Sequence, residues 1–296
     1  MTRLGFKIAF MQVRGPFLIL SIVLVAIGVS AASKTASIDW INVFLLLIGV
    51  ILAHISVNLF NEASDYKTEI DSNTKRTPFS GGSGLLQAGE TSIHHVRFAA
   101  FASIFVAAII GVYFVFTAGL PIAILMLIGG FSIIFYTDFL ARYFLGEPFA
   151  GLSLGSLVVI GVYYALTSQI NFQIVLTAIP PGLLTALLLF LNELPDVEAD
   201  KMGGRKHLVI LLGKKRSVLF YITGLIFTYG FIAACVILGK VPAAVSISLI
   251  TSVFAVRASQ ISIKHFDCID KMIPALGLNV LVVILTDLLI AVGYLI

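Results

Sequence analysis

The chain has 296 residues, of which 59% are hydrophobic and only 11% are charged, and its formal net charge is +4. Soluble domains contain roughly 25% charged residues, so this composition excludes an ordinary soluble protein and indicates a chain that lies mostly in a lipid bilayer. The excess positive charge requires no nucleic-acid partner, because the orientation bias of membrane proteins accounts for it.

Stretches of about 20 apolar residues are long enough for a helix to cross the hydrocarbon core of a bilayer. The chain contains nine such stretches, at residues 15–32, 39–60, 93–116, 119–137, 149–168, 172–194, 217–238, 241–257 and 273–296. We therefore predict an all-α fold, a polytopic bundle of nine transmembrane helices around a central cavity. A single domain is expected to span residues 1–296.

The charged residues are distributed very unequally between the two predicted membrane faces. The face with the N-terminus and the connections after the second, fourth, sixth and eighth spans holds 17 of the 19 Lys and Arg residues. Because cytoplasmic loops carry the excess of basic residues, we predict a cytoplasmic N-terminus, an outer C-terminus and a location in the plasma membrane. Cys235 and Cys268 fall near opposite faces, so no disulfide is expected between them.

Two connections on the predicted cytoplasmic face are long, at residues 61–92 and 193–216, and they begin with related sequences. Asn-Glu-Ala-Ser-Asp at residues 61–65 reappears as Asn-Glu-Leu-Pro-Asp at residues 192–196, 131 residues later. Each copy follows an even-numbered apolar span. This pattern predicts a duplicated four-helix unit with a ninth helix added.

The repeated motif carries the side chains that indicate chemistry. Asn and Asp lie four residues apart in each copy, so on a helix they share one face, and a further Asp follows each pair. Carboxylates at a membrane boundary need a partner, and Mg²⁺ prefers oxygen ligands together with substrate phosphates. The predicted metal ligands are Asp65, Asp71, Asp196 and Asp200, with Asn61 and Asn192 helping to hold metal or diphosphate.

Basic residues beside both motifs could bind the phosphates of a substrate, since guanidinium groups pair well with phosphate oxygens. The candidates that follow the motifs are Lys67, Arg76, Arg205 and Lys206. Arg14, before the first span, either reaches a diphosphate or anchors the helix at the interface. Tyr136, at the end of the fourth span, is either a ligand or an interfacial anchor.

Competing interpretations exist for these polar residues. Charged residues at helix ends are commonly solvated loop faces or helix caps, but the repetition of the motif at matching places favours a shared site. The run at residues 81–84, Gly-Gly-Ser-Gly, is typical of a turn. Asp287 lies inside the last span, where we predict a buried hydrogen bond within the bundle.

At these motifs the chain resembles the UbiA superfamily of intramembrane prenyltransferases, and the resemblance covers nearly the whole sequence. Residues 58–71 resemble its Asn-x-x-x-Asp signature with the later Asp, and residues 192–208 resemble its Asp-x-x-x-Asp loop. The resemblance implies Mg²⁺-dependent transfer of a prenyl group to a small aromatic acceptor inside the membrane. Geranyl, farnesyl and geranylgeranyl diphosphate are the implied donors.

Three features resemble the branch that prenylates 1,4-dihydroxy-2-naphthoate in menaquinone biosynthesis. They are the six-residue step from Asp65 to Asp71, the glycine run at residues 81–84, and residues 145–147 together with residues 161–164. A Tyr-x-x-x-Lys motif of many members is missing, because Leu140 follows Tyr136 at the lysine position, and Arg142 is the candidate substitute.

Other acceptors remain open within the superfamily, namely 4-hydroxybenzoate, geranylgeranylglyceryl phosphate, haem or a chlorin. A transporter is the alternative of another class. It is suggested by the polytopic architecture alone, because nearly all acidic residues lie at one face and no continuous polar path crosses the predicted spans.

Overall fold

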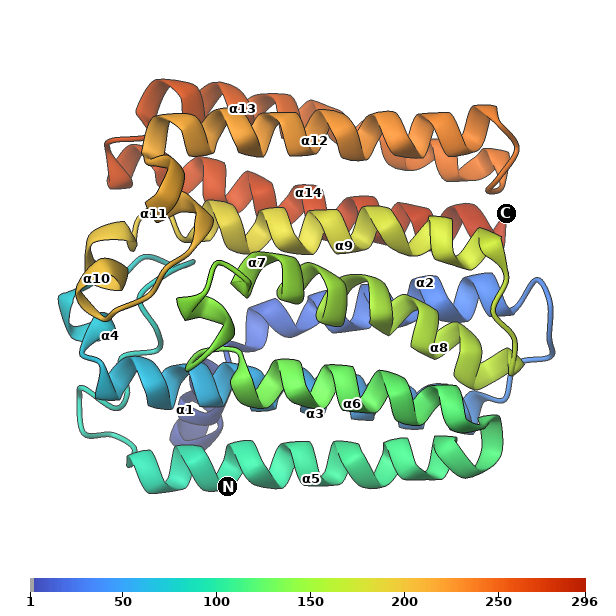
Figure 1. Cartoon of the computed structure of the whole chain (residues 1–296), viewed down its shortest axis with the longest axis horizontal. Helices are drawn as coiled ribbons and strands as arrows, with labels where there is room; N and C mark the ends of the chain where they lie inside the picture. Colours follow the sequence, from blue (N-terminus) through green and yellow to red (C-terminus); the bar gives the residue numbers. More distant parts are fainter. Residues whose placement is uncertain (1–2) are drawn as a thin grey trace.

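The computed structural model describes residues 3–296, and within this range the chain forms helices and connecting loops without any strand. Long helices lie side by side along the long axis of the molecule (Figure 1). The predicted all-α fold class is therefore confirmed for the described part of the chain.

In the described part of the chain, nine helical segments run along the bundle. They are η1–α2 (Gly15–Leu18 and Ile19–Ala32), α3 (Trp40–Lys67), α5 (Ile93–Ala118), α6 (Leu120–Phe135), α7–η3–α8 (Gly146–Phe149, Ala150–Ser156 and Leu157–Thr167), α9 (Phe172–Asn192), α12 (Lys214–Ile237), η4–α13 (Ala243–Thr251 and Ser252–His265) and α14 (Ile269–Leu295). The shorter helices are α1 (Arg3–Gln12), α4 (Ile70–Asn73), η2 (Leu140–Arg142), α10 (Val197–Met202) and α11 (Leu208–Leu212).

Each predicted span corresponds to one of these long segments. Eight of the segments in the described range are long and apolar enough to cross a membrane, and α6 is apolar but has only 16 residues. Helix α13 extends to His265, beyond the predicted end at residue 257. The first polar connection also begins later than predicted, because α3 continues through residues 61–67, which contain no Gly or Pro to end it.

The largest buried apolar cluster joins α2, α8, α9, α12 and α14, and smaller clusters join α3 with α5 and α6 with α8. The outer surface of the long helices exposes large apolar side chains such as Phe98, Phe116 and Ile237. A bilayer solvates such side chains, whereas in water a surface of this kind would cause the protein molecules to associate with one another.

The polar connections gather at one end of the bundle. Helices α4, α10 and α11 lie together at this end, and the C-terminus lies at the opposite end (Figure 1). The two long polar loops, which are far apart in sequence, are therefore neighbours in space.

Two predictions about single residues have different outcomes. Cys235 and Cys268 are both free, as predicted. The hydrogen bond predicted for Asp287 is wrong, because its side chain is fully buried and neither carboxyl oxygen has a hydrogen-bond partner among the described residues. Tyr229 of the neighbouring helix α12 instead shares its hydroxyl group with Thr251 and Thr286.

Candidate functional site

A cavity of about 530 Å³ opens inside the bundle, between α2, α3, α5, α6, α8 and α9. Apolar residues of these helices form most of its wall. At one end the wall becomes polar, and both repeated motifs contribute to it. The motif residues that line this polar end are Asn61, Asp65, Asp71, Asn192, Asp196 and Asp200.

The first motif lies on the last two turns of α3, as its four-residue spacing predicts. Asn61 Nδ2 donates a hydrogen bond to Asp65 Oδ2 at 3.1 Å. His54, two turns earlier, also lines the cavity, and Ser21 holds its Nδ1 at 2.9 Å. One face of α3 therefore carries polar side chains from the cavity interior to its polar end.

The glutamate of the first motif has a separate role. Glu62 is buried, and its carboxylate accepts hydrogen bonds from the backbone N–H and the hydroxyl group of Ser83. This contact holds the glycine-rich loop against α3. In that loop Gly82 has φ +63°, and a Cβ there would lie 2.0 Å from Asp71 Oδ2, so only glycine permits this approach.

The Asn and Asp of the second motif do not share one helical face, because this motif does not lie on one continuous helix. Helix α9 ends at Asn192, a turn follows, and α10 begins after Asp196. Pro195 explains the break, because it lacks an N–H and its ring would clash with the carbonyl of residue 191 in a continued helix. Asp196 and Asp200 are then related by a helical turn, in which Asp200 N donates to Asp196 O at 2.8 Å.

Arg205 connects the two motifs directly. Its Nη2 donates to Asn61 Oδ1 at 2.8 Å and to Asp65, and its Nη1 donates to Asp200 Oδ1 at 3.1 Å. The guanidinium group thus lies between a carboxylate of each motif. Asp65, Asp200 and Arg205 are largely buried, so these ion pairs are shielded from water.

The acidic residues at this end strongly affect one another. Burial, followed by the neighbouring Asp65, raises the pKa of Asp71 to about 7. Burial and the neighbouring Asp200 raise the pKa of Asp196 to about 7 as well. Such a site favours a cation or bound protons over free carboxylates.

Three oxygen atoms of the predicted Asn and Asp site residues have no hydrogen-bond partner among the described residues. They are Asp71 Oδ2, Asn192 Oδ1 and Asp196 Oδ1, and all three are shielded from water. Buried polar atoms usually have a partner, so these oxygens are suited to binding a cation. Mg²⁺ accepts ligands of this all-oxygen kind.

The predicted phosphate-binding residues divide into two groups. Arg14, Tyr136 and Arg205 line the cavity, and Arg14 has a left-handed backbone with φ 53°. The other four candidates do not line it: Lys67, Arg76, Arg142 and Lys206. Arg142 was the expected substitute for the missing lysine. In the described part of the chain, Arg205 lies at the polar end and Arg142 does not.

Sequence reasoning missed two side chains that support the motifs. Thr137 Oγ1 donates to Asn61 Oδ1 at 3.2 Å, and Ser80 lines the cavity wall together with Asp196. Both lie in loops without a repeated pattern, and only the folded chain brings them to the motifs. Nothing in their spacing distinguishes them from ordinary loop residues.

The chain is similar to known proteins in sequence. Residues 20–267 match the family described as the UbiA prenyltransferase family. The 1,4-dihydroxy-2-naphthoate octaprenyltransferase of Bacillus subtilis (strain 168) is 30% identical over 228 residues, 74% of this chain and 70% of that protein. The protein of the same name from Haemophilus influenzae (strain ATCC 51907 / DSM 11121 / KW20 / Rd) is 24% identical over 186 residues, 60% of this chain and 59% of that protein.

Solved structures share the fold. A UbiA homologue from Aeropyrum pernix K1 has a TM-score of 0.71 at 16% identity, covering 94% of this chain and 96% of that chain. A UbiA homologue from Archaeoglobus fulgidus bound to DMAPP and Mg²⁺ has a TM-score of 0.63 at 15% identity, covering 96% of this chain and 99% of that chain.

The family match covers most of the chain, and the structure shares the fold of a solved UbiA homologue. The family match favours an enzyme over the transporter that the polytopic architecture alone suggested. The chain belongs to the UbiA prenyltransferase family and is an integral membrane prenyltransferase.

Proposed function

We propose that the chain transfers a prenyl group from a magnesium-bound prenyl diphosphate to 1,4-dihydroxy-2-naphthoate inside the membrane. The observation that carries the proposal is the convergence of both Asn and Asp motifs at the polar end of one largely apolar cavity. The names of the Bacillus and Haemophilus relatives support the acceptor. The Archaeoglobus homologues bound to DMAPP or GPP with Mg²⁺ support the donor and the metal.

The motif residues at the polar end fit Mg²⁺, because the unpartnered buried atoms of their Asn and Asp side chains are oxygens. The residues that would hold the metal are Asp65, Asp71, Asp196 and Asp200, with Asn61 and Asn192 beside them. When bound, Mg²⁺ supplies neutralisation of the negative charge that develops on the diphosphate leaving group.

The chain's own residues supply the rest of the chemistry. Arg205 keeps the carboxylates of both motifs at the polar end, and its charge, with that of Arg14, favours an anionic diphosphate there. The apolar wall accommodates the prenyl chain and excludes water from the allylic carbon as its bond to oxygen lengthens. Charge stabilisation at one end and exclusion of water at the other therefore come from different parts of the same cavity.

We further infer that the polar end faces the cytoplasm in the plasma membrane, with the C-terminus outside. The support is the charge bias, since 17 of 19 Lys and Arg residues belong to that side of the predicted layout. We also infer one domain, built from two related halves and a ninth helix, because the same motif follows the second long helix of each half.

The test uses purified protein with Mg²⁺, labelled geranyl, farnesyl or geranylgeranyl diphosphate, and a panel of acceptors, with products identified by mass. The expected result is a prenylated naphthoate product that disappears when EDTA replaces Mg²⁺. A product formed only with another acceptor would overturn the naphthoate assignment. Turnover that persists in EDTA would overturn the role of the metal.

A further inference from the structure

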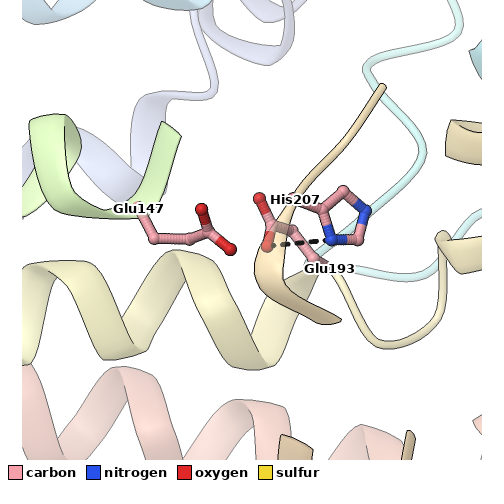
Figure 2. Close-up of side chains that lie close together, drawn as sticks. All are labelled: Glu147, Glu193 and His207. Carbon is pink, nitrogen blue, oxygen red and sulfur yellow. Dashed lines mark ion pairs between the residues drawn. The ribbon is translucent and has the colours of Figure 1, made fainter. Parts of the chain in front are cut away.

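A second group of ionisable side chains lies behind the polar end of the cavity. Glu147 at the start of α7, Glu193 just after α9 and His207 just before α11 point toward one another (Figure 2). One ligand atom from each residue lies within 4.8 Å of the other two. Glu147 and His207 are only 2% and 1% exposed, and Glu193 also reaches the cavity wall.

The outer atoms of this group are already hydrogen-bonded. Glu147 Oε1 accepts a hydrogen bond from the backbone N–H of Leu208 at 2.8 Å. His207 Nε2 lies 3.2 Å from Asp200 Oδ2. These contacts fix the orientation of the Glu147 carboxylate and of the His207 ring.

The inner atoms are the ones without hydrogen-bond partners. Glu147 Oε2, Glu193 Oε2 and His207 Nδ1 are all shielded from water and have no such partner among the described residues. His207 Nδ1 lies 3.4 Å from Glu193 Oε2. Three unpartnered atoms from three distant parts of the sequence therefore face one enclosed point.

Two adjacent carboxylates in a buried site repel each other unless they share a proton or a cation lies between them. Arg205, the cation near them, is already bonded to Asn61, Asp65 and Asp200. Apart from His207, which lies 3.4 Å from Glu193 Oε2, the group has no basic side chain of its own. The cavity cation proposed above would not supply a positive charge there, because Glu147 and His207 do not line the cavity.

The ligand chemistry differs from that of the cavity motifs. An imidazole nitrogen with two carboxylate oxygens suits Zn²⁺ and its first-row neighbours, whereas Mg²⁺ prefers oxygen ligands alone. Asp200 on the far nitrogen of His207 is also the partner that metal-bound histidines usually have. We propose that Glu147, Glu193 and His207 bind a divalent transition-metal ion of the manganese-to-zinc series.

The backbone around the site is already closely packed. Gly155 lies so near α9 that a Cβ there would be 2.5 Å from Gly182 Cα, which allows the helix that carries Glu147 to approach α9. Phe144 N donates to Lys206 O at 2.9 Å, and Lys206 N donates to Ala141 O at 3.0 Å. A metal ion there would join three segments that already touch, and would hold the loop that carries Asp196 and Asp200.

The first test measures the metal itself. The full-length protein is purified with a tag that contains no histidine run, dialysed against a Mg²⁺ buffer, and examined by mass spectrometry of its elements. We expect about one transition-metal ion per chain in the wild type. Glu147→Gln and His207→Gln are expected to lose it. Glu62→Gln is the matched control. Glu62 occupies the position in the first motif that Glu193 occupies in the second, but its carboxylate is hydrogen-bonded to Ser83.

The second test adds Zn²⁺ or Mn²⁺ to EDTA-treated protein that contains excess Mg²⁺, and follows thermal unfolding. The melting temperature is expected to rise in the wild type and to stay unchanged in Glu147→Gln. It should also rise in Asp65→Asn, which lacks a ligand of the proposed Mg²⁺ site, so this variant separates the transition-metal site from prenyl transfer. Folded wild-type protein that contains no transition metal and shows no such rise would overturn the proposal, even if the variants fail to fold.

Discussion

The two copies of the Asn-Glu-x-x-Asp motif adopt different backbone structures, yet both deliver Asn and Asp to the same cavity. The first copy lies on one uninterrupted helix, α3, whereas Pro195 divides the second between the end of α9 and the start of α10. The two copies therefore place their side chains in the same cavity although their backbone conformations differ.

The contacts around the two copies differ even more. Glu62 of the first copy has hydrogen-bond donors in Ser83, whereas Glu193 of the second faces Glu147 and His207. Arg205 follows the second copy but binds Asn61 and Asp65 of the first. The two halves are thus complementary, because the second supplies the cation that both carboxylate groups share.

The largest expected effect tests what the copies have in common. Asp65→Asn and Asp196→Asn should each lower kcat/KM at least about 100-fold, since each removes a charged oxygen from the predicted metal site. The control is Glu198→Gln, an exposed acid on α10, which should retain activity. Steady-state kinetics on folded protein decides the matter, and a variant with normal turnover would remove that copy from the site.

The next effect tests the asymmetry. Arg205→Lys should lower kcat/KM about 10-fold to 100-fold, because one ammonium group cannot reproduce the planar fork that joins both carboxylates. Lys201→Gln, an exposed cation in the same loop, is the control. Equal rates for Arg205→Lys and the wild type would show that a positive charge alone suffices there.

A pH effect should involve one acid from each half. Asp71 and Asp196 both have a pKa raised to about 7, so below pH 7 they hold protons that a metal must displace. Mg²⁺ affinity should therefore rise with pH up to about 7, by at most about tenfold per pH unit for each proton released. Calorimetry in two buffers counts these protons, and Asp71→Asn should remove one of them. Binding without proton release at pH 6 would contradict the assignment.

The same shifts have a consequence for the metal-free protein. Because the folded state binds these protons more tightly than the unfolded state, stability is expected to fall as pH rises from about 4 to about 7. Thermal unfolding in EDTA across this range checks the sign.

The smallest effect concerns the glutamate of the first motif. Glu62→Gln should cost about 1–3 kcal/mol of stability, because Ser83 loses a charged acceptor for two hydrogen bonds. The loosened glycine loop should raise KM for the diphosphate a few-fold while kcat changes little. A larger fall in kcat than in 1/KM would mean that Glu62 acts in the reaction itself.

The sequence alone determined the fold class, the approximate spans and the free cysteines, because each depends on local composition and on chain length. The apolar stretches must cross lipid wherever they pack, so their positions predict the helices directly. The family resemblance followed from the two motifs, and the family match confirmed it. The roles of the individual site residues stay predictions.

Only the tertiary structure decided which basic residue lies at the polar end and where the second motif leaves its helix. Arg205, Arg142 and Lys206 are alike in sequence, but the path of the loop after α10 brings Arg205 alone of the three to the cavity wall. The group of Glu147, Glu193 and His207 was likewise beyond sequence reasoning, because its members are separated by up to 60 residues. Contacts of this range depend on how helices pack, which no local pattern encodes.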